Sequence, residues 1–246
     1  ERTEREQRER REEEERQRAE RVAAFTAAAD LYFRAAREIA PGLVEPLIDY
    51  SGIEMTAPAC DPSRPPRTHA VLVGADDIGL ERARLKGPVN DVKLMESLLL
   101  DRGADAANLH VLTGGQATRS GLAEAFLKVL AGTGCDDRIF LHFSTHGYDS
   151  TMFSSGALSF SVEGNPFRAE WEELGKTIKF DDLREAFAAG EIDVSPAMAF
   201  FAGNAFDAGN VDVALMLNDD SELFQEIVLG RDVSEFMIAV RNKGAH

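Results

Sequence analysis

The sequence predicts an α/β protein in which a mostly parallel sheet carries helices on both faces. From residue 69 onward, short apolar segments alternate with amphipathic segments of helical period. In these apolar segments, polar residues do not alternate with apolar ones as they do in a strand with one solvent-exposed face. Each segment is therefore expected to be buried on both sides. Helices that connect such strands must lie above and below the sheet, which gives three layers.

The predicted elements of these layers follow one another without long gaps as far as residue 144. Residues 69–75 (HAVLVGA) form an apolar run that predicts the first strand. The next helix, 88–102, has proline at its start and Gly103 just past its end, as helices often do. The remaining predictions are strands at 108–113, 138–144, 196–202 and 211–217, and helices at 118–130, 181–188 and 232–241.

A charged helical arm precedes these elements. Residues 1–21 contain nine Glu and eight Arg and no side chain that could build a core. Glu and Arg recur four residues apart, and each such pair is worth about 0.2–0.5 kcal/mol in a helix. We therefore expect a solvated, self-supporting helix. It is either a spacer to an upstream regulatory module or partner, or simply a helix that precedes a domain.

The composition changes twice after this arm. Apolar side chains recur at helical spacing from Val22 to Ile39, and this apolar stripe must pack against another part of the protein or a partner. Residues 56–67 then carry four of the nine prolines of the chain and predict an extended linker. The expected division is a helical arm at 1–40, a proline-rich linker at 41–67 and a globular domain at 68–243.

Charge and composition narrow the function classes. The net charge is −16, with 43 acidic and 27 basic side chains, which disfavours nucleic acid and favours a basic peptide as partner. No apolar run has the length of a membrane span, and no signal peptide opens the chain. The first residue is not methionine, so we expect a fragment. Cys60 and Cys135 are too few for a disulfide framework and lack metal-ligand spacing, which favours the cytoplasm.

Two predicted strands end in residues suited to nucleophilic catalysis. Strand 138–144 runs into Thr145-His146-Gly147, and strand 196–202 runs into a loop of small residues that contains Ala205. Chemistry in such sheets occurs at the carboxyl ends of the strands. A histidine base and a nucleophile on neighbouring loops would fit there, with backbone N–H groups worth about 3 kcal/mol each to an oxyanion. Position 205, however, holds no nucleophile.

Segments of the chain, in order, resemble the caspase-like cysteine peptidases. The likeness is nearer to bacterial caspase-like proteins and metacaspases than to animal caspases, and it covers about residues 68–241. S-x-H-G alone is a weak motif, but a series of matches at the right intervals is specific. The segments are VLVGADD, LKGPVNDVKLMESLL, NLHVLTGGQATRSGLAEAFLKVLAG, DRIFLHFSTHGYD, AFFAGNAFDAG and VALMLNDDSELFQEIVLGRDVSEFMIAV.

The resemblance implies a fold, an activity and roles for individual residues. It implies a three-layer caspase-like domain and an endopeptidase that needs no metal or organic cofactor. His146 would be the general base of a Cys/His dyad, position 205 the nucleophile, and Gly147 an oxyanion N–H donor. A role in regulated proteolytic signalling or bacterial defence would suit such a domain behind a helical arm.

The same resemblance implies a substrate with arginine or lysine at P1. Asp91 and Ser144 correspond to positions that help to line the pocket for a basic side chain. The aspartate expected just before the nucleophile is replaced by Gly203, so one carboxylate of that pocket is absent. The region after the histidine commonly holds processing sites in this family, which makes Arg168 and Lys176 candidates in a segment, 148–179, that lacks a clear period.

Two explanations of Ala205 stay open. Either a catalytic cysteine has been replaced by alanine, or the protein is a natural pseudo-peptidase that binds or scaffolds a peptide without cutting it. The intact His146 and Gly147 favour a replaced cysteine. Three other histidines, at positions 69, 110 and 142, are expected to be structural, the first two without an acid or thiol partner. Cys135 precedes its strand and is expected at the end of the sheet opposite His146.

Overall fold

The computed structural model describes residues 2–39, 41–56, 60–61, 63–79, 81–148, 166–178, 182, 185–186, 189–190, 214–218 and 227–246. The chain divides into two compact units. One comprises Glu1–Glu38 with Ser150–Val211, and the other comprises Ile39–Asp149 with Asp212–His246. The helical arm therefore belongs to the same unit as the segment after residue 150, a grouping that spans two of the ranges expected from sequence.

A parallel sheet forms the centre of the second unit. Its strands are β1 (Thr68–Gly74), β2 (Leu109–Thr113) and β3 (Arg138–Ser144), arranged in the order β2-β1-β3. Thr68 pairs with Arg138 and Gly74 with Ser144, so β1 and β3 begin and end side by side. The three strands lie within one or two residues of the predicted ranges.

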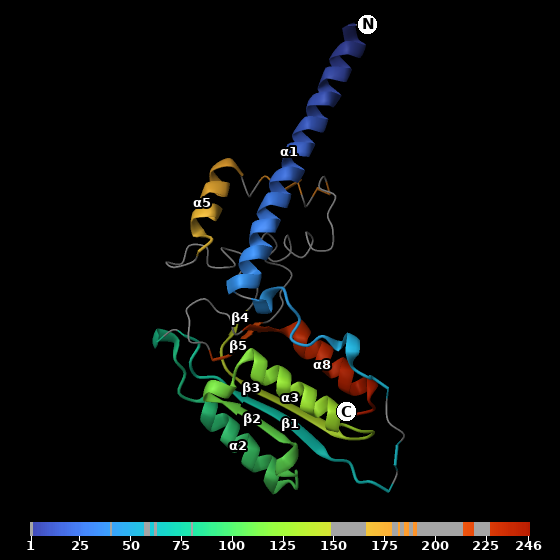
Figure 1. The fold of residues 1–246 in the computed structure, drawn as a ribbon, viewed down its shortest axis with the longest axis vertical. Coiled ribbons are helices and arrows are strands. Elements are labelled where there is room, and N and C mark those ends of the chain that lie inside the picture. Colours follow the sequence, from blue (N-terminus) through green and yellow to red (C-terminus); the bar gives the residue numbers. More distant parts are fainter. Residues whose placement is uncertain are drawn as a thin grey trace. The chain divides into compact units, whose positions relative to one another are not determined.

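Helices cover both faces of this sheet, which confirms the predicted three-layer fold (Figure 1). Alternate residues of β1 point to opposite faces, as in any strand. Ala70 and Leu72 pack with Val92 of α2 (Pro88–Asp101). Val71 and Val73 share the other core with α3 (Arg119–Gly132) and α8 (Gly230–Asn242), whose Phe126 and Phe236 rings stack with centroids 3.8 Å apart.

A small antiparallel sheet continues from the end of β3. It consists of β4 (Gly147–Tyr148), β5 (Ala214–Met216) and β6 (Ile227–Leu229), in that order. β5 lies inside the predicted strand 211–217, whereas β4 and β6 were not predicted. Strands of two or three residues are too short to show a period in the sequence. The predicted strand 196–202 lies outside the described residues, as does most of the predicted helix 181–188.

The first unit contains the predicted arm as one helix, α1 (Arg2–Ile39). Ion pairs such as Arg5–Glu9 (2.8 Å) and Arg10–Glu14 (2.9 Å) run along its exposed part. Phe25 and Tyr32 of the apolar stripe are fully buried, so the stripe does dock. A second helix, α5 (Arg168–Thr177), corrects the expectation of irregular structure throughout 148–179. Its period was hard to see because three of its ten residues are Glu and only two are large and apolar.

A buried carboxylate joins the segments that lead into β1 and β3. Asp137 is fully buried and accepts hydrogen bonds from the backbone N–H groups of Arg67 and Gly134. Both guanidinium groups of the linker reach it, Arg64 at 3.0 Å and Arg67 at 2.9 Å. Burial by itself would raise the pKa of Asp137, but the hydrogen bonds outweigh burial and hold that pKa well below its ordinary value.

His69 is a further partner of Asp137, with its Nε2 atom 3.3 Å from the carboxylate. The prediction that His69 has no acid partner was therefore wrong. The two residues are 68 positions apart, and only the pairing of β1 with β3 brings them together. Burial lowers the pKa of His69, opposed by the Asp137 charge and assisted by Arg67. The ring is therefore neutral at neutral pH and donates Nε2–H to the carboxylate.

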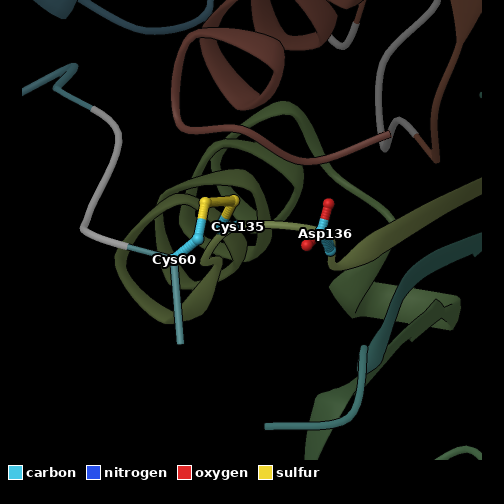
Figure 2. A group of neighbouring side chains, drawn as sticks. All are labelled: Cys60, Cys135 and Asp136. Carbon is cyan, nitrogen blue, oxygen red and sulfur yellow. A yellow bond between two sulfur atoms is a disulfide. The ribbon is translucent and has the colours of Figure 1, made fainter. Parts of the chain in front are cut away.

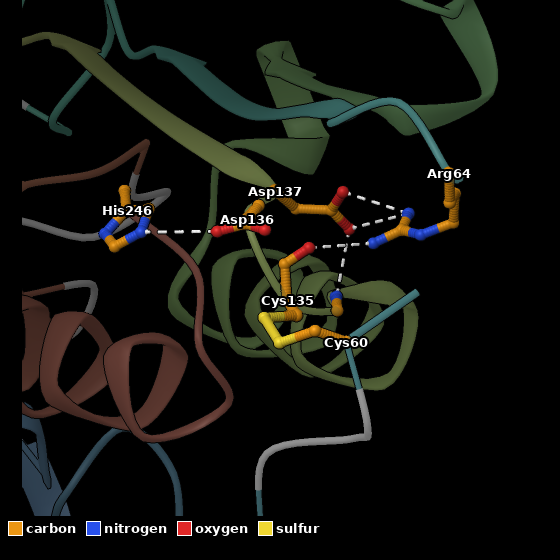
Figure 3. The surroundings of a disulfide bond; sticks show 7 residues. Cys60, Arg64, Cys135, Asp136, Asp137 and His246 are labelled. Carbon is orange, nitrogen blue, oxygen red and sulfur yellow. Dashed lines mark hydrogen bonds and ion pairs between the residues drawn. A yellow bond between two sulfur atoms is a disulfide. The ribbon is translucent and has the colours of Figure 1, made fainter. Parts of the chain in front are cut away.

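The two cysteines form a disulfide, which corrects the expectation of a chain without one (Figure 3). Cys60 precedes β1 and Cys135 precedes β3, and their Cα atoms are 5.2 Å apart. Because the two strands start side by side, the segments in front of them also meet. A spacing of 75 residues in the sequence gave no sign of this proximity. Cys135 does lie at the end of β3 opposite His146, as predicted.

These shifted groups predict a loss of stability in acid. The unfolded chain takes up a proton on His69 near its ordinary pKa of 6.5, whereas the folded protein does so at lower pH. The contribution of His69 is thus complete above about pH 6.5 and decreases as the pH falls below it. Asp137 adds a second decrease below its ordinary pKa of 3.8. Urea unfolding at a series of pH values should show both, and His69→Gln should reduce the first slope. An unchanged slope in that variant would contradict the assignment.

Candidate active site

His146 lies two residues beyond the carboxyl end of β3 and faces the loop that follows β1. Its Nε2 atom is 2.5 Å from the backbone carbonyl oxygen of Ala83, on the 3₁₀ turn Glu81–Ala83. A carbonyl oxygen can only accept, so Nε2 carries the hydrogen. In the neutral ring, Nδ1 then keeps the lone pair that a general base requires. The contact with Ala83 thus fixes both the tautomer and the ring orientation of His146.

Two residues of the predicted pocket meet beside this histidine. Ser144, the last residue of β3, donates a 2.7 Å hydrogen bond from its hydroxyl to the carboxylate of Asp91 in the first turn of α2. Helix α2 can pack this close to the end of β1 because residue 74 is glycine. A Cβ atom there would lie 2.8 Å from the Pro88 carbonyl oxygen, which is too close for any other residue. The sequence brings Asp91 and Ser144 together through this glycine.

Gly147 begins β4, directly after His146. It pairs with Leu215 of β5, and β5 in turn pairs with β6. The small sheet therefore fixes the backbone just past the histidine, where the predicted oxyanion donor lies. The other half of the predicted site cannot be placed in this way, because Ala205 and Gly203 lie outside the described residues.

The two processing candidates both lie in helix α5. Arg168 is its first residue and pairs with Glu172 at 2.8 Å, and Lys176 in its last turn pairs with Glu173. Proteases cleave extended chain, so a cut after either residue would require α5 to unwind at that end. Neither residue belongs to the unit that contains His146.

Asn218 is a structural residue of this edge that the sequence reasoning missed. Its side-chain oxygen accepts from the backbone N–H of Asp77 at 3.1 Å, and its side-chain amide donates to the carbonyl of Gly114. Its own N–H donates to Ala117 at 2.8 Å. Asn218 thereby ties the loops after β1 and β2 to the end of β5. No spacing rule indicates such a residue, because its partners lie more than a hundred positions away.

The fold and the histidine at the strand end define a class of protein, the caspase-type α/β/α peptidases. Residues 67–188 match the caspase domain family. The chain also resembles metacaspase-1 of Candida albicans, with 33% identity over 87 residues, which is 33% of this chain and 19% of that protein. Metacaspase III c of Phaeodactylum tricornutum shows 32% identity over 83 residues, 32% of this chain and 25% of that protein.

The chain is thus caspase-like and metacaspase-like over its matched residues. The alignments span only about a fifth to a quarter of the length of these relatives. Among the residues that the structure describes, no helix has both the length and the apolar character needed to span a bilayer.

Proposed function

We propose that this domain is a cysteine endopeptidase in which a thiol at position 205 works with His146. The observation that carries the proposal is the 2.5 Å contact between His146 Nε2 and the Ala83 carbonyl oxygen. It leaves Nδ1 as the basic nitrogen at the edge of the sheet where the strands of this fold present their catalytic residues. The ring is also held in one orientation, as the base of a nucleophile requires.

The reaction would proceed through a thioester. His146 Nδ1 accepts the thiol proton, the sulfur attacks the scissile carbonyl carbon, and the N–H groups of Gly147 and residue 205 stabilise the oxyanion. The protonated ring then donates its proton to the leaving amine, and water hydrolyses the acyl-enzyme. The chain as it stands has alanine at position 205 and lacks the sulfur for this first step. No step needs a metal or an organic cofactor.

We further propose that the substrate carries arginine or lysine at P1. The support is the Asp91 carboxylate held by Ser144 beside His146, together with the net charge of −16. The absence of a carboxylate at Gly203 makes Asp91 the main charged contact in this proposal.

Asp91→Asn in the Ala205→Cys background is expected to raise KM for an arginine peptide about tenfold, the lower range for a lost charged hydrogen bond. The matched control is Asp101→Asn at the other end of the same helix, which should leave KM unchanged. The measurement is the initial rate of cleavage across a series of peptide concentrations. Equal effects of the two variants would rule out a pocket role for Asp91.

A natural pseudo-peptidase is the second candidate, and Ala205 itself is the observation in its favour. Such a protein would bind a basic peptide and pass on a signal through α1 without cutting. The unmodified coding sequence at position 205 separates the two candidates directly. A cysteine codon supports the peptidase, and an alanine codon supports the binding module.

The proposed setting is regulated signalling or bacterial defence in the cytoplasm, with an upstream module or partner acting through α1. Autoprocessing after Arg168 or Lys176 would be the activating step. Incubation of the Ala205→Cys form should then give fragments with those residues at their new carboxyl termini, detectable by mass spectrometry. An uncut chain that still cleaves a peptide in trans would show that activation needs no processing.

A further inference from the structure

The loop between β1 and α2 carries the carbonyl group that orients His146. The acceptor is the backbone oxygen of Ala83, 2.5 Å from His146 Nε2. Ala83 is the last residue of the 3₁₀ turn Glu81–Ala83. The hydrogen bond that closes this turn is long, 3.3 Å from the Arg84 nitrogen to the Glu81 oxygen, and 3₁₀ turns have poorer hydrogen-bond geometry than α-helices. Other contacts of the loop must therefore set the position of this carbonyl.

Two contacts close the base of the loop, one after the other. The N–H of Leu85 donates to the carbonyl oxygen of Asp76 at 2.9 Å. One residue further into the loop on each side, Arg84 pairs with the Asp77 carboxylate, with Nη2 3.2 Å from Oδ2. Arg84 directly follows Ala83 in the chain, so this ion pair acts on the residue next to the carbonyl acceptor.

Asp77 is itself held from several sides. Its backbone N–H donates to the side-chain oxygen of Asn218 at 3.1 Å, and its carboxylate accepts from the N–H of Gly79 at 3.2 Å. Gly79 has φ +81°, a conformation that favours glycine, so the sequence supports this turn. Ile78, between the two residues, is fully buried. The Asp77 carboxylate is therefore a fixed point to which the other side of the loop is tied.

We propose that Asp77 and Arg84 are positioning residues for His146, because their ion pair holds the Ala83 carbonyl where it accepts Nε2–H. The consequence for catalysis rests on the peptidase function proposed above, whereas the orientation of the ring does not. The Asp77 and Arg84 side chains are 39% and 52% exposed, so the pair adds little to the stability of the fold. A small displacement can still cost much in catalysis, because the rate depends steeply on alignment.

Nitrogen-15 NMR of the His146 ring tests the proposal in the chain with Ala205 and needs no activity. At a pH where the ring is neutral, the parent chain should show a protonated Nε2 and an unprotonated Nδ1. Asp77→Asn keeps an acceptor for Gly79 but removes the charge that binds Arg84, and Arg84→Gln removes the other partner. In both variants the Nδ1 signal should shift toward that of a protonated nitrogen, as the second tautomer becomes populated.

Two controls lie on the same turn. Arg82→Gln removes the same charge as Arg84→Gln from an exposed side chain. Glu81→Gln changes a carboxylate that is 90% exposed and 3.9 Å from Arg84. Both should leave the ring signals unchanged, and all four variants should keep the parent Tm. Unchanged ring signals in Asp77→Asn and Arg84→Gln, an equal change in the controls, or a large loss of Tm would overturn the proposal.

Kinetics in the Ala205→Cys form measure the consequence for catalysis. Asp77→Asn and Arg84→Gln should each lower kcat about tenfold and leave KM for an arginine peptide unchanged. The double variant should lose no more than either single variant, since both break one contact. A raised KM with an unchanged kcat would place Arg84 against the substrate and overturn the positioning role. If the ring signals respond as expected but the Ala205→Cys form cleaves nothing, the peptidase proposal fails and the role of the ion pair in orienting His146 is supported.

Discussion

Ala205→Cys is expected to produce a thiol-dependent peptidase that cleaves after arginine or lysine, whereas the chain with Ala205 is expected to cleave neither. The base for the new thiol is already oriented, since His146 donates Nε2–H to the Ala83 carbonyl and its other ring nitrogen, Nδ1, carries the lone pair. In this cysteine-containing form, His146→Ala should lower kcat/KM by about 10³-fold, within the range for loss of a positioned general base. The measurement is hydrolysis of a fluorogenic arginine peptide, with and without a thiol-alkylating reagent.

The control for this experiment is His110→Ala in the same background. His110 is also a strand histidine, but it lies on β2 at the outer edge of the described sheet, away from Ala83. It should leave kcat/KM unchanged. If the Ala205→Cys protein is folded but cleaves neither arginine nor lysine peptides, the pseudo-peptidase becomes the better account. If His146→Ala and His110→Ala have equal effects, His146 is not the base.

Asp137→Ala is expected to destabilise the protein by about 3 kcal/mol, the range for removing one partner of a buried charged network. The change would leave the guanidinium groups of Arg64 and Arg67 without their carboxylate and His69 without its acceptor. Because the two arginine side chains are 31% and 43% exposed, water can still solvate them, and the loss of stability is smaller than for a fully buried network. Urea unfolding of the oxidised protein, monitored by circular dichroism, measures the difference.

Asp136→Asn is the matched control for this second experiment. Asp136 is the adjacent residue and is exposed, and its φ of 64° is one that asparagine tolerates well. Its effect on the oxidised protein should stay within about 0.5 kcal/mol. A loss of similar size in both variants would mean that the loop, and not the buried carboxylate, is responsible.

The two ends of the central sheet carry different groups of residues. At the carboxyl ends of β1 and β3 lie Ala83, Ser144 and His146, which belong to the proposed peptidase site. The segments in front of the same strands hold Asp137 and the disulfide (Figure 2). β3 has seven residues, so about 20 Å separates the two ends. A change at the disulfide is therefore expected to act on stability rather than directly on substrate.

Much of the sheet could be predicted from the sequence because its signals are local. The run HAVLVGA and the proline at position 88 each depend on neighbours within one element, and both predicted elements are present. Asp91 and Ser144 were assigned to one pocket only through the family resemblance, and the hydrogen bond between them was not predicted. The short strands β4 and β6 were not predicted, because two or three residues cannot show a period. Helix α5 was not predicted, because it has too few apolar side chains to show a helical period.

By itself, the sequence determined the fold class, the order of the main strands and helices, and a histidine at the end of β3. Only the tertiary structure decided which distant residues meet: His146 with the Ala83 carbonyl, His69 with Asp137, and Cys60 with Cys135. The physical reason is that periodicity and capping are properties of adjacent residues. A side chain's partner across a sheet depends on strand order and register, which no local pattern encodes.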